Sequence, residues 1–354
     1  MKSKYFLPLF LVVQILFLKI IAYFPEVVEQ YYSTGLFPYI SRFSRIALGT
    51  IPFSIGDCLY FGLILLLVRW LWTTSRKSWR TNWKNNSLQL ISFVSVFYFF
   101  FHLFWALNYY RQPLFEKLKI EKEYSDADLL AFTQQLILKT NAVHRQLTND
   151  DRKAVLFPYT LVQELGKSEL GYKNLAAKHP FFEYQNLSVK ESLFSVPLTY
   201  MGFGGYLNPF TNEAQVNYLL PRYSSPMTTS HEMAHQIGFA SESECNFIGF
   251  LACVKNDNLY FKYSGYSFAL RYCLHNWQLR DEAVYLNLIQ IINPGILANY
   301  KETDDFWNQY DSFIDKGFHA FYDSFLKINQ QKDGINSYSK FVDLMVNYYK
   351  TEKL

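Results

Sequence analysis

Three apolar segments, each about 20 residues long, constrain this chain more than any other feature of its sequence. They cover residues 5–24, 51–72 and 88–107. A helix needs about 20 mostly apolar residues to cross the hydrocarbon core of a bilayer, so each segment is predicted to be a transmembrane helix. The first segment is longer than the apolar part of a signal peptide and no small-residue cleavage site follows it. It is therefore predicted to remain as an anchor.

The charged residues are distributed unevenly along the chain. Half of all residues are hydrophobic, yet the mean hydropathy is only −0.06, so an apolar part and a soluble part must coexist. Residues 1–110 contain 10 Lys and Arg against 3 Asp and Glu, whereas residues 111–354 contain 24 against 27. The basic excess thus belongs to the apolar part, where it flanks membrane spans. The sequence therefore predicts a lipid bilayer as partner. Because the rest of the chain is slightly acidic, it excludes nucleic acid as a partner.

The charges of the loops predict how the spans are oriented. The loop between the second and third spans has basic residues and no acidic ones, namely Arg76, Lys77, Arg80 and Lys84. The loop between the first and second spans has balanced charges, namely Glu26, Glu29, Arg42 and Arg45. Since cytoplasmic loops are rich in Lys and Arg, the N-terminus is predicted to be cytoplasmic. We therefore expect a multi-pass protein of the plasma membrane, with a membrane domain at 1–110 and an extracytoplasmic domain at 111–354.

The extracytoplasmic part is predicted to be mainly α-helical with a small β region. A capping box at Ser125 and Asp128 begins an amphipathic helix over 125–147. Apolar spacing predicts five further helices, at 242–255, 264–278, 281–293, 303–328 and 338–350. Glycine and proline interrupt the helical pattern before these, and residues 214–219 are the best candidate for a strand. The stretch 202–206, rich in glycine, lacks the spacing of a phosphate loop and is predicted to be a turn or binding loop.

The residues His231-Glu232-Met-Ala-His235 form an HExxH motif. On a helix, the two histidines lie one turn apart on the same face, so both imidazoles can bind one Zn²⁺ ion. Glu232 is turned about 100° away and is predicted to be the catalytic general base. A capping box formed by Thr229 and Glu232, with a left-handed stop at Gly238, predicts a short helix here. Two surface histidines on an ordinary amphipathic helix are the competing interpretation.

Two histidines leave a zinc site incomplete, and glutamates just downstream can complete it. Glu242 and Asn246 are one helical turn apart, so Glu242 is predicted to bind zinc and Asn246 to orient a ligand histidine, as in gluzincins. Glu244 is the alternative ligand, or it closes a capping box with Ser241. Gly249 would let the second helix approach the first closely. Two imidazoles and one carboxylate are the ligand set of a catalytic zinc with an open position.

These motifs carry a resemblance to a known family. The runs 231–240 and 242–247, followed by Tyr-Ser-Gly-Tyr at 263–266 and the segment 338–343, are similar to a bacterial family of membrane proteins filed as a domain of unknown function. That family is regarded as zinc metallopeptidase-like. The resemblance implies three transmembrane helices followed by a zincin-like α+β domain with a gluzincin-type site, and it implies no particular substrate. Cys245 stands where the resemblance would place a small residue such as Ala.

Together these features predict a membrane-anchored zinc metallopeptidase, an amide-bond hydrolase that acts on a peptide or protein outside the cytoplasm. An intramembrane protease, which also uses HExxH, is one alternative, but the sequence argues against it because polar residues surround the motif and the apolar run at 247–254 has only eight residues. A non-catalytic sensor or scaffold with a structural zinc is the alternative, although such a site has no use for Glu232.

Other polar residues have weaker roles in this scheme. Four side chains are candidate donors to an oxyanion, namely Tyr218, Arg222, Tyr263 and Tyr266. Four histidines outside the motif are not expected to bind metal, namely His144, His179, His275 and His319.

Overall fold

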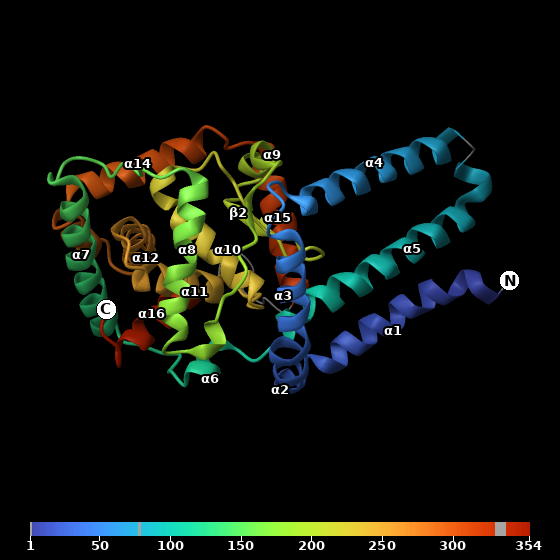
Figure 1. Cartoon of the computed structure of the whole chain (residues 1–354), viewed down its shortest axis with the longest axis horizontal. Helices are drawn as coiled ribbons and strands as arrows, with labels where there is room; N and C mark the ends of the chain where they lie inside the picture. Colours follow the sequence, from blue (N-terminus) through green and yellow to red (C-terminus); the bar gives the residue numbers. More distant parts are fainter. Residues whose placement is uncertain (1, 77–78, 330–337) are drawn as a thin grey trace.

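The computed structural model describes residues 2–76, 79–329 and 338–354. The described chain is mainly helical and contains one sheet of three short strands, which confirms the predicted mainly α class with a small β region. Three long helices project from one side of a helical body, and the N-terminus lies at their far end (Figure 1).

The projecting helices are α1 (Phe6–Ile21), α4 (Ile55–Arg76) and α5 (Trp79–Phe104). Helices α1 and α5 pack against each other along the projection, and α4 also contacts α5 (Figure 1). Helix α5 ends three residues before the predicted boundary at 107, because Trp105 leaves helical geometry and a 3₁₀ turn over Ala106–Tyr110 follows it. The chain thereby turns from the projecting helices into the body.

Two of these helices are long and apolar enough to cross a membrane, over Ile55–Ser75 and Asn82–Phe104. Helix α1 reaches this length only together with the helices that follow it, Pro25–Leu48, from which it is bent by 104°. The three predicted spans therefore correspond to two candidate spans, or to three when the bent pair is counted as one. This result is compatible with a membrane protein.

The segment between the first and second spans, which was expected to be a loop, is helical. It consists of α2 (Pro25–Val27), a π-helical stretch over Val28–Leu36 and α3 (Phe37–Leu48). Glu29 in this segment forms buried ion pairs with Arg111 at 2.8 Å and Lys117 at 2.6 Å. These contacts cross the predicted domain boundary at residue 110, so the first loop forms part of the wall of the body.

The body contains eleven helices among its described residues, and they surround a core centred on α11 and α12. They are α6 (Leu114–Leu118), α7 (Asp126–Thr148), α8 (Leu161–Ala176), α9 (Ser195–Tyr200), α10 (Ser225–Gln236), α11 (Glu242–Lys255), α12 (Leu259–Arg280), α13 (Glu282–Gln290), α14 (Pro294–Asn308), α15 (Phe313–Ile328) and α16 (Tyr338–Tyr349). Helix α11 has the predicted bounds, and α7 begins at the predicted capping box. The single helix predicted over 303–328 is wrong, because Ser312 caps a new helix by accepting a hydrogen bond from the backbone of Asp315.

The sheet lies beside α10 and consists of β1 (Val189–Glu191), β2 (Gly205–Leu207) and β3 (Ala214–Val216). Its order is β1-β3-β2, with β3 parallel to β1 and antiparallel to β2. The predicted strand over 214–219 is thus present but shorter, and it is the central strand. Strand β2 is left at an edge, on the side that faces the projecting helices.

Buried charges attach the start of α4 to this sheet. Glu213 accepts hydrogen bonds from the backbone of Ile55 and Gly56 at 3.2 and 2.6 Å, and it pairs with Lys190 at 2.6 Å. Asp57 accepts from the backbone of Leu193 at 2.7 Å and from the hydroxyl of Tyr206. A carboxylate at a helix N-terminus satisfies N–H groups that have no partner within the helix. The body therefore holds α4 in a fixed position relative to the sheet.

Candidate metal centre

Helix α10 carries the HExxH motif, and it begins earlier than predicted. Its first residue is Ser225, so Thr229 lies inside the helix and the predicted capping box with Glu232 is wrong. The hydroxyl of Thr229 instead donates to the buried carboxylate of Glu164 at 2.8 Å. Gly238 ends the segment with a φ of +93°, the left-handed geometry that the sequence predicted.

Three side chains from two helices converge at one point. The Nε2 atoms of His231 and His235 are 3.1 Å apart, and Glu242 Oε2 lies 3.2 Å from the first and 3.8 Å from the second. Their donor atoms all lie within 4.8 Å of one another. Among the described residues, this is the one group of three or more His, Cys, Asp or Glu side chains arranged to hold a metal ion.

Hydrogen bonds behind the histidines orient both rings toward this point. His231 Nδ1 donates to Asn246 Oδ1 at 2.8 Å, and His235 Nδ1 donates to the carbonyl of Phe239 at 2.8 Å. With Nδ1 protonated, each Nε2 keeps its lone pair for a ligand, which is the tautomer that a metal needs. Asn246 thus lies where the sequence placed a residue that orients a histidine. Cys245 packs beside the second ring, its sulfur 3.2 Å from His235 Nδ1.

The two candidate glutamates have separate roles in the structure. Glu244 points away from the histidines and accepts a hydrogen bond from the backbone of Leu114 at 2.7 Å. Its capping box with Ser241 is not formed, since Ser241 makes no side-chain capping bond. Glu242 joins the histidines; burial acts to raise its pKa, but the attraction of His231 and His235 outweighs burial and holds that pKa well below its usual value.

A residue that the sequence analysis missed also contacts this group. The hydroxyl of Tyr322 on α15 donates to Glu242 Oε1 at 2.7 Å. It lies 80 positions downstream in a chain with 28 tyrosines, so no local pattern could have distinguished it. Trp105, at the end of α5, was missed for the same reason, and its indole donates to the carbonyl of His235 at 3.4 Å.

Glu232 lies on the same helix as the histidines and is buried. Its Oε2 atom has no hydrogen-bond partner among the described residues. Burial raises the pKa of Glu232 to about 7, against the opposing attraction of His231 and His235. A Cβ atom on Gly205 of β2 would lie 2.6 Å from the backbone oxygen of Gln215 and 2.7 Å from Glu232 Oε1, so glycine lets the strand pass close to this carboxylate. An orphaned buried carboxylate next to three converging ligand atoms fits a centre that holds a cation and a water molecule.

Gly249 brings the two site helices together. A Cβ atom there would lie 2.9 Å from the backbone nitrogen of His231, which is closer than real Cβ atoms approach. Helix α11 can therefore present Glu242 and Asn246 to α10 only with glycine at this position, as the sequence analysis expected.

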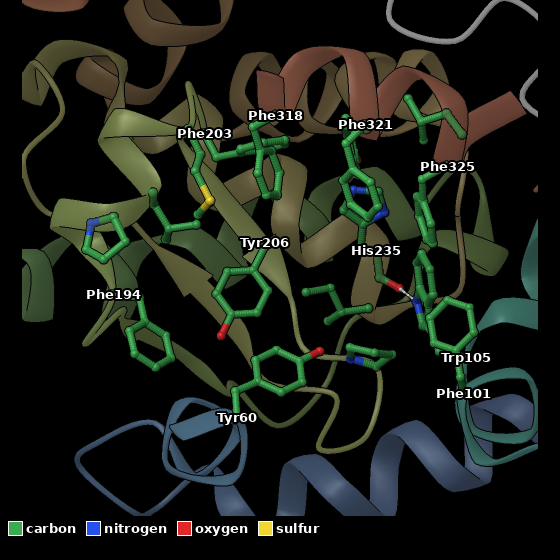
Figure 2. A pocket seen from close by; sticks show the side chains of 18 of the residues that line it. Tyr60, Phe101, Trp105, Phe194, Phe203, Tyr206, His235, Phe318, Phe321 and Phe325 are labelled. Atoms are coloured by element: carbon green, nitrogen blue, oxygen red, sulfur yellow. Dashed lines mark hydrogen bonds between the residues drawn. The ribbon is translucent and has the colours of Figure 1, made fainter. Parts of the chain in front are cut away.

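A cavity of about 1840 Å³ opens onto the three ligands and Glu232. Figure 2 shows its walls, which are largely aromatic: Phe318, Phe321 and Phe325 come from α15, Tyr60 from α4, and Phe101 with Trp105 from the end of α5. Strand β2 adds Tyr206 to the wall between them (Figure 2). The predicted binding loop at 202–206 lines this cavity in full.

The weaker candidates lie elsewhere. None of the four proposed oxyanion donors lines the cavity: Arg222 pairs with Glu164, Tyr263 donates to Asn299, Tyr266 is buried in the core and Tyr218 is largely exposed. His144, His179 and His275 do not line it either. His319 does line it, 3.0 Å from Asp315 and outside the group of three ligands.

Fold and site together define a mainly helical chain that has candidate membrane spans and a His-His-Glu group beside a buried glutamate. Residues 32–346 match the family described as protein of unknown function (DUF3810), and the chain belongs to that family. The match covers most of the chain. No curated protein and no solved structure matches it significantly.

Proposed function

We propose that this protein is a membrane-anchored, zinc-dependent metallopeptidase with a zincin-like domain, which hydrolyses an amide bond outside the cytoplasm. The observation that carries the proposal is the buried Glu232, which has an unpartnered oxygen and stands on the same helix as two converging histidines. A structural zinc needs four protein ligands and no free carboxylate. Here three side chains converge and a base remains available, which is the arrangement of a catalytic site.

Each residue has a defined task in this proposal. His231, His235 and Glu242 hold Zn²⁺, which when bound polarises the amide carbonyl and makes water more acidic. Glu232 accepts a proton from the attacking water and returns it to the leaving nitrogen. The C–N bond breaks, the hydroxyl of water joins the carbonyl carbon, and the proton ends on the amine. Asn246 keeps His231 in the binding orientation.

The arrangement of charge supports the proposed orientation in the plasma membrane. Lys4, at the start of the chain, donates to Asn85 near the start of α5 at 3.5 Å, so the start of the chain and the start of α5 share one end of the projection. The body with its metal centre lies at the other end (Figure 1). Since basic residues favour the cytoplasmic side, the centre is assigned to the outside.

Metal content tests the ligand assignment directly. The full-length protein, purified in detergent, is expected to contain one Zn²⁺ per chain, and His231→Ala or His235→Ala is expected to lose it because two protein ligands cannot retain the ion. His319→Ala is the matched control, since this histidine lines the same cavity outside the ligand group. Elemental analysis after dialysis provides the measurement. Stoichiometric zinc in the double mutant His231→Ala/His235→Ala would refute the site.

The substitution Glu232→Gln separates an enzyme from a scaffold. It preserves shape and removes the base, so zinc content and thermal stability should persist while turnover falls by a factor on the order of 10² to 10⁴. A cellular form of the assay replaces the native copy with the variant and compares its phenotype with that of a deletion. If Glu232→Gln behaves like the wild type where the deletion does not, the protein is a zinc-stabilised sensor or scaffold and the peptidase proposal fails.

A further inference from the structure

The cavity at the metal centre continues between the two candidate spans. On one side it is lined by α4 from Tyr60 to Thr73, and on the other by α5 from Gln89 to Phe101. The same cavity reaches His231, His235 and Glu242. A single space therefore joins the ligand group to the interior of the projecting helices.

The groove is about two thirds as long as the hydrocarbon core of a bilayer is thick. At 1.5 Å per residue, the stretch of α4 from Tyr60 to Thr73 is about 20 Å long, against a hydrocarbon core of about 30 Å. Both helices are candidate spans over this stretch. Because Glu213 and Asp57 attach the start of α4 to the sheet, the groove has a fixed position relative to Glu232. In the proposed orientation, the groove would lie at bilayer depth, with the candidate metal centre at its outer end.

The groove walls favour hydrocarbon chains over a protein helix. Large apolar side chains line most of them, among them Leu63, Leu67 and Trp70 on α4 and Phe93 and Phe97 on α5, and Arg69 adds one charged side chain. Helices that pack together in membranes present small residues, which let their backbones approach. Gly62, the glycine in this part of α4, is not among the lining residues. The groove is therefore shaped for a thin, flexible apolar chain.

The outer end of the groove offers hydrogen bonds to an amide. Strand β2 is an edge strand, and the residues that flank it bond to the residues that flank β3: Asn217 N donates to Gly204 O and Asn208 N to Glu213 O, both at 2.9 Å. In an antiparallel pair these bonds alternate along the strand, so the backbone of Gly205 and Leu207 faces away from β3. Both residues line the cavity.

We propose that the substrate is lipid-anchored: its hydrocarbon chain lies between α4 and α5, and the amide next to that chain reaches the metal ligands and Glu232. This inference rests on the proposed hydrolase function and specifies the substrate class of the same site. The metal centre lies beside the bilayer, and the anchor of the substrate, held in the groove, places the scissile bond at the membrane surface.

Photo-crosslinking with an acylated probe tests the groove without requiring turnover. The probe is an N-palmitoyl tripeptide amide with a diazirine on its acyl chain, added to full-length Glu232→Gln protein in phosphatidylcholine and phosphatidylglycerol vesicles. Excess unlabelled palmitoyl tripeptide should suppress labelling of the groove residues, while the N-acetyl tripeptide should not. Mass spectrometry of the labelled peptides from α4 and α5 gives the positions.

Substitutions on opposite sides of α4 give a matched pair. Leu67→Trp fills the groove. It should reduce the labelling that unlabelled palmitoyl tripeptide can suppress by about tenfold, because overpacking a binding space costs about 1–3 kcal/mol. Leu65→Trp, two positions earlier and outside the lining, should leave it unchanged. Leu63→Trp is a second groove variant if the first loses its zinc and hence its fold.

Two other labelling outcomes would overturn the inference. If both sides of α4 are labelled equally and unlabelled palmitoyl tripeptide does not suppress the labelling, then bulk lipid fills the groove. Competition by a transmembrane peptide but not by the palmitoyl tripeptide would mean that the site takes membrane-spanning proteins. If labelling behaves as expected but the wild type hydrolyses no acylated amide, the groove assignment stands and the proposed hydrolase function is the part that fails.

Discussion

Asn246 illustrates how much a single side chain outside the ligand group contributes to the metal centre. It accepts the Nδ1 proton of His231 at 2.8 Å and so fixes the tautomer of that ligand. We expect Asn246→Ala to weaken zinc binding about 10- to 100-fold, the usual effect of losing such a partner. Asn246→Asp should retain most of the affinity because it keeps an acceptor there. Titration against a metal chelator, with the full-length protein, measures both.

Cys245 provides the control for this prediction. Its sulfur contacts the ring of His235, but a thiol is a weak hydrogen-bonding group and Phe239 already accepts the Nδ1 proton. Cys245→Ala should therefore change zinc affinity by no more than about twofold. An equal loss of affinity in Cys245→Ala and Asn246→Ala would show that any cavity beside the ligands weakens the site, and would contradict a specific role for the asparagine.

The residues of the site differ in how far the sequence could reveal them. The HExxH spacing predicts that His231 and His235 share one helix face, since both positions belong to a single turn. The choice between Glu242 and Glu244 could not be made from spacing alone, because it depends on where α6 presents the backbone of Leu114. Tyr322 had no local signal, since only the packing of α15 brings it to Glu242.

Helices α10 and α11 depend on the absence of a side chain where they cross. Gly249→Ala would place a methyl group 2.9 Å from the backbone of His231, so the helices must separate. We expect a loss of about 1–3 kcal/mol in the free energy of unfolding, typical of overpacking, together with weaker zinc binding. Thermal unfolding in detergent, with and without added zinc, measures both effects.

Gly166 provides the matched comparison on another helix. No atom lies within 4 Å of where its Cβ would stand in α8, so Gly166→Ala should be neutral or stabilise the protein by up to about 1 kcal/mol through helix propensity. If both alanine variants unfold at the wild-type temperature, the close approach of α10 and α11 does not limit stability and the argument from Gly249 is wrong.

Elements with strong local signals were the ones that the sequence predicted well. Helix α11 and the start of α7 follow from apolar spacing and caps. Strands β1 and β2 have three residues each, too few for an alternating pattern to stand out. The helices between residues 25 and 48 were expected to be a loop between spans, because their buried apolar residues, such as Val28, Tyr32 and Phe37, do not form an uninterrupted apolar run.

At the scale of the whole molecule, the orientation in the membrane is the first property to test. A reporter fused after Leu354 should be active outside the cytoplasm, because three spans with a cytoplasmic N-terminus place the body there. A reporter inserted between α4 and α5 should instead give the readout of a cytoplasmic location. Alkaline phosphatase and a cytoplasmic fluorescent protein give opposite readouts for the two sites. A cytoplasmic signal at Leu354 would mean that α1 does not cross the membrane.

The whole arrangement was the hardest level to predict. Apolar segments and loop charges gave candidate spans and a direction, because hydrocarbon thickness and charge act on short stretches of sequence. How the body sits on those spans depends on contacts between residues far apart in the chain, such as Glu213 with Ile55 and Trp105 with His235. The cavity between α4 and α5 therefore had no counterpart in the sequence analysis.

The contacts of the first loop imply an order of events during synthesis. Under the proposed topology, the segment with Glu29 and Ser41 is exported before Arg111, Lys117 and Gln236 have left the ribosome. Its flanking spans then hold this segment at the membrane. The later chain would fold against it, as Arg111 and Lys117 pair with Glu29 and the carbonyl of Gln236 accepts a hydrogen bond from Ser41. If the protein is the proposed hydrolase, its metal centre would form only after export and tethering, so we expect no activity before both are complete.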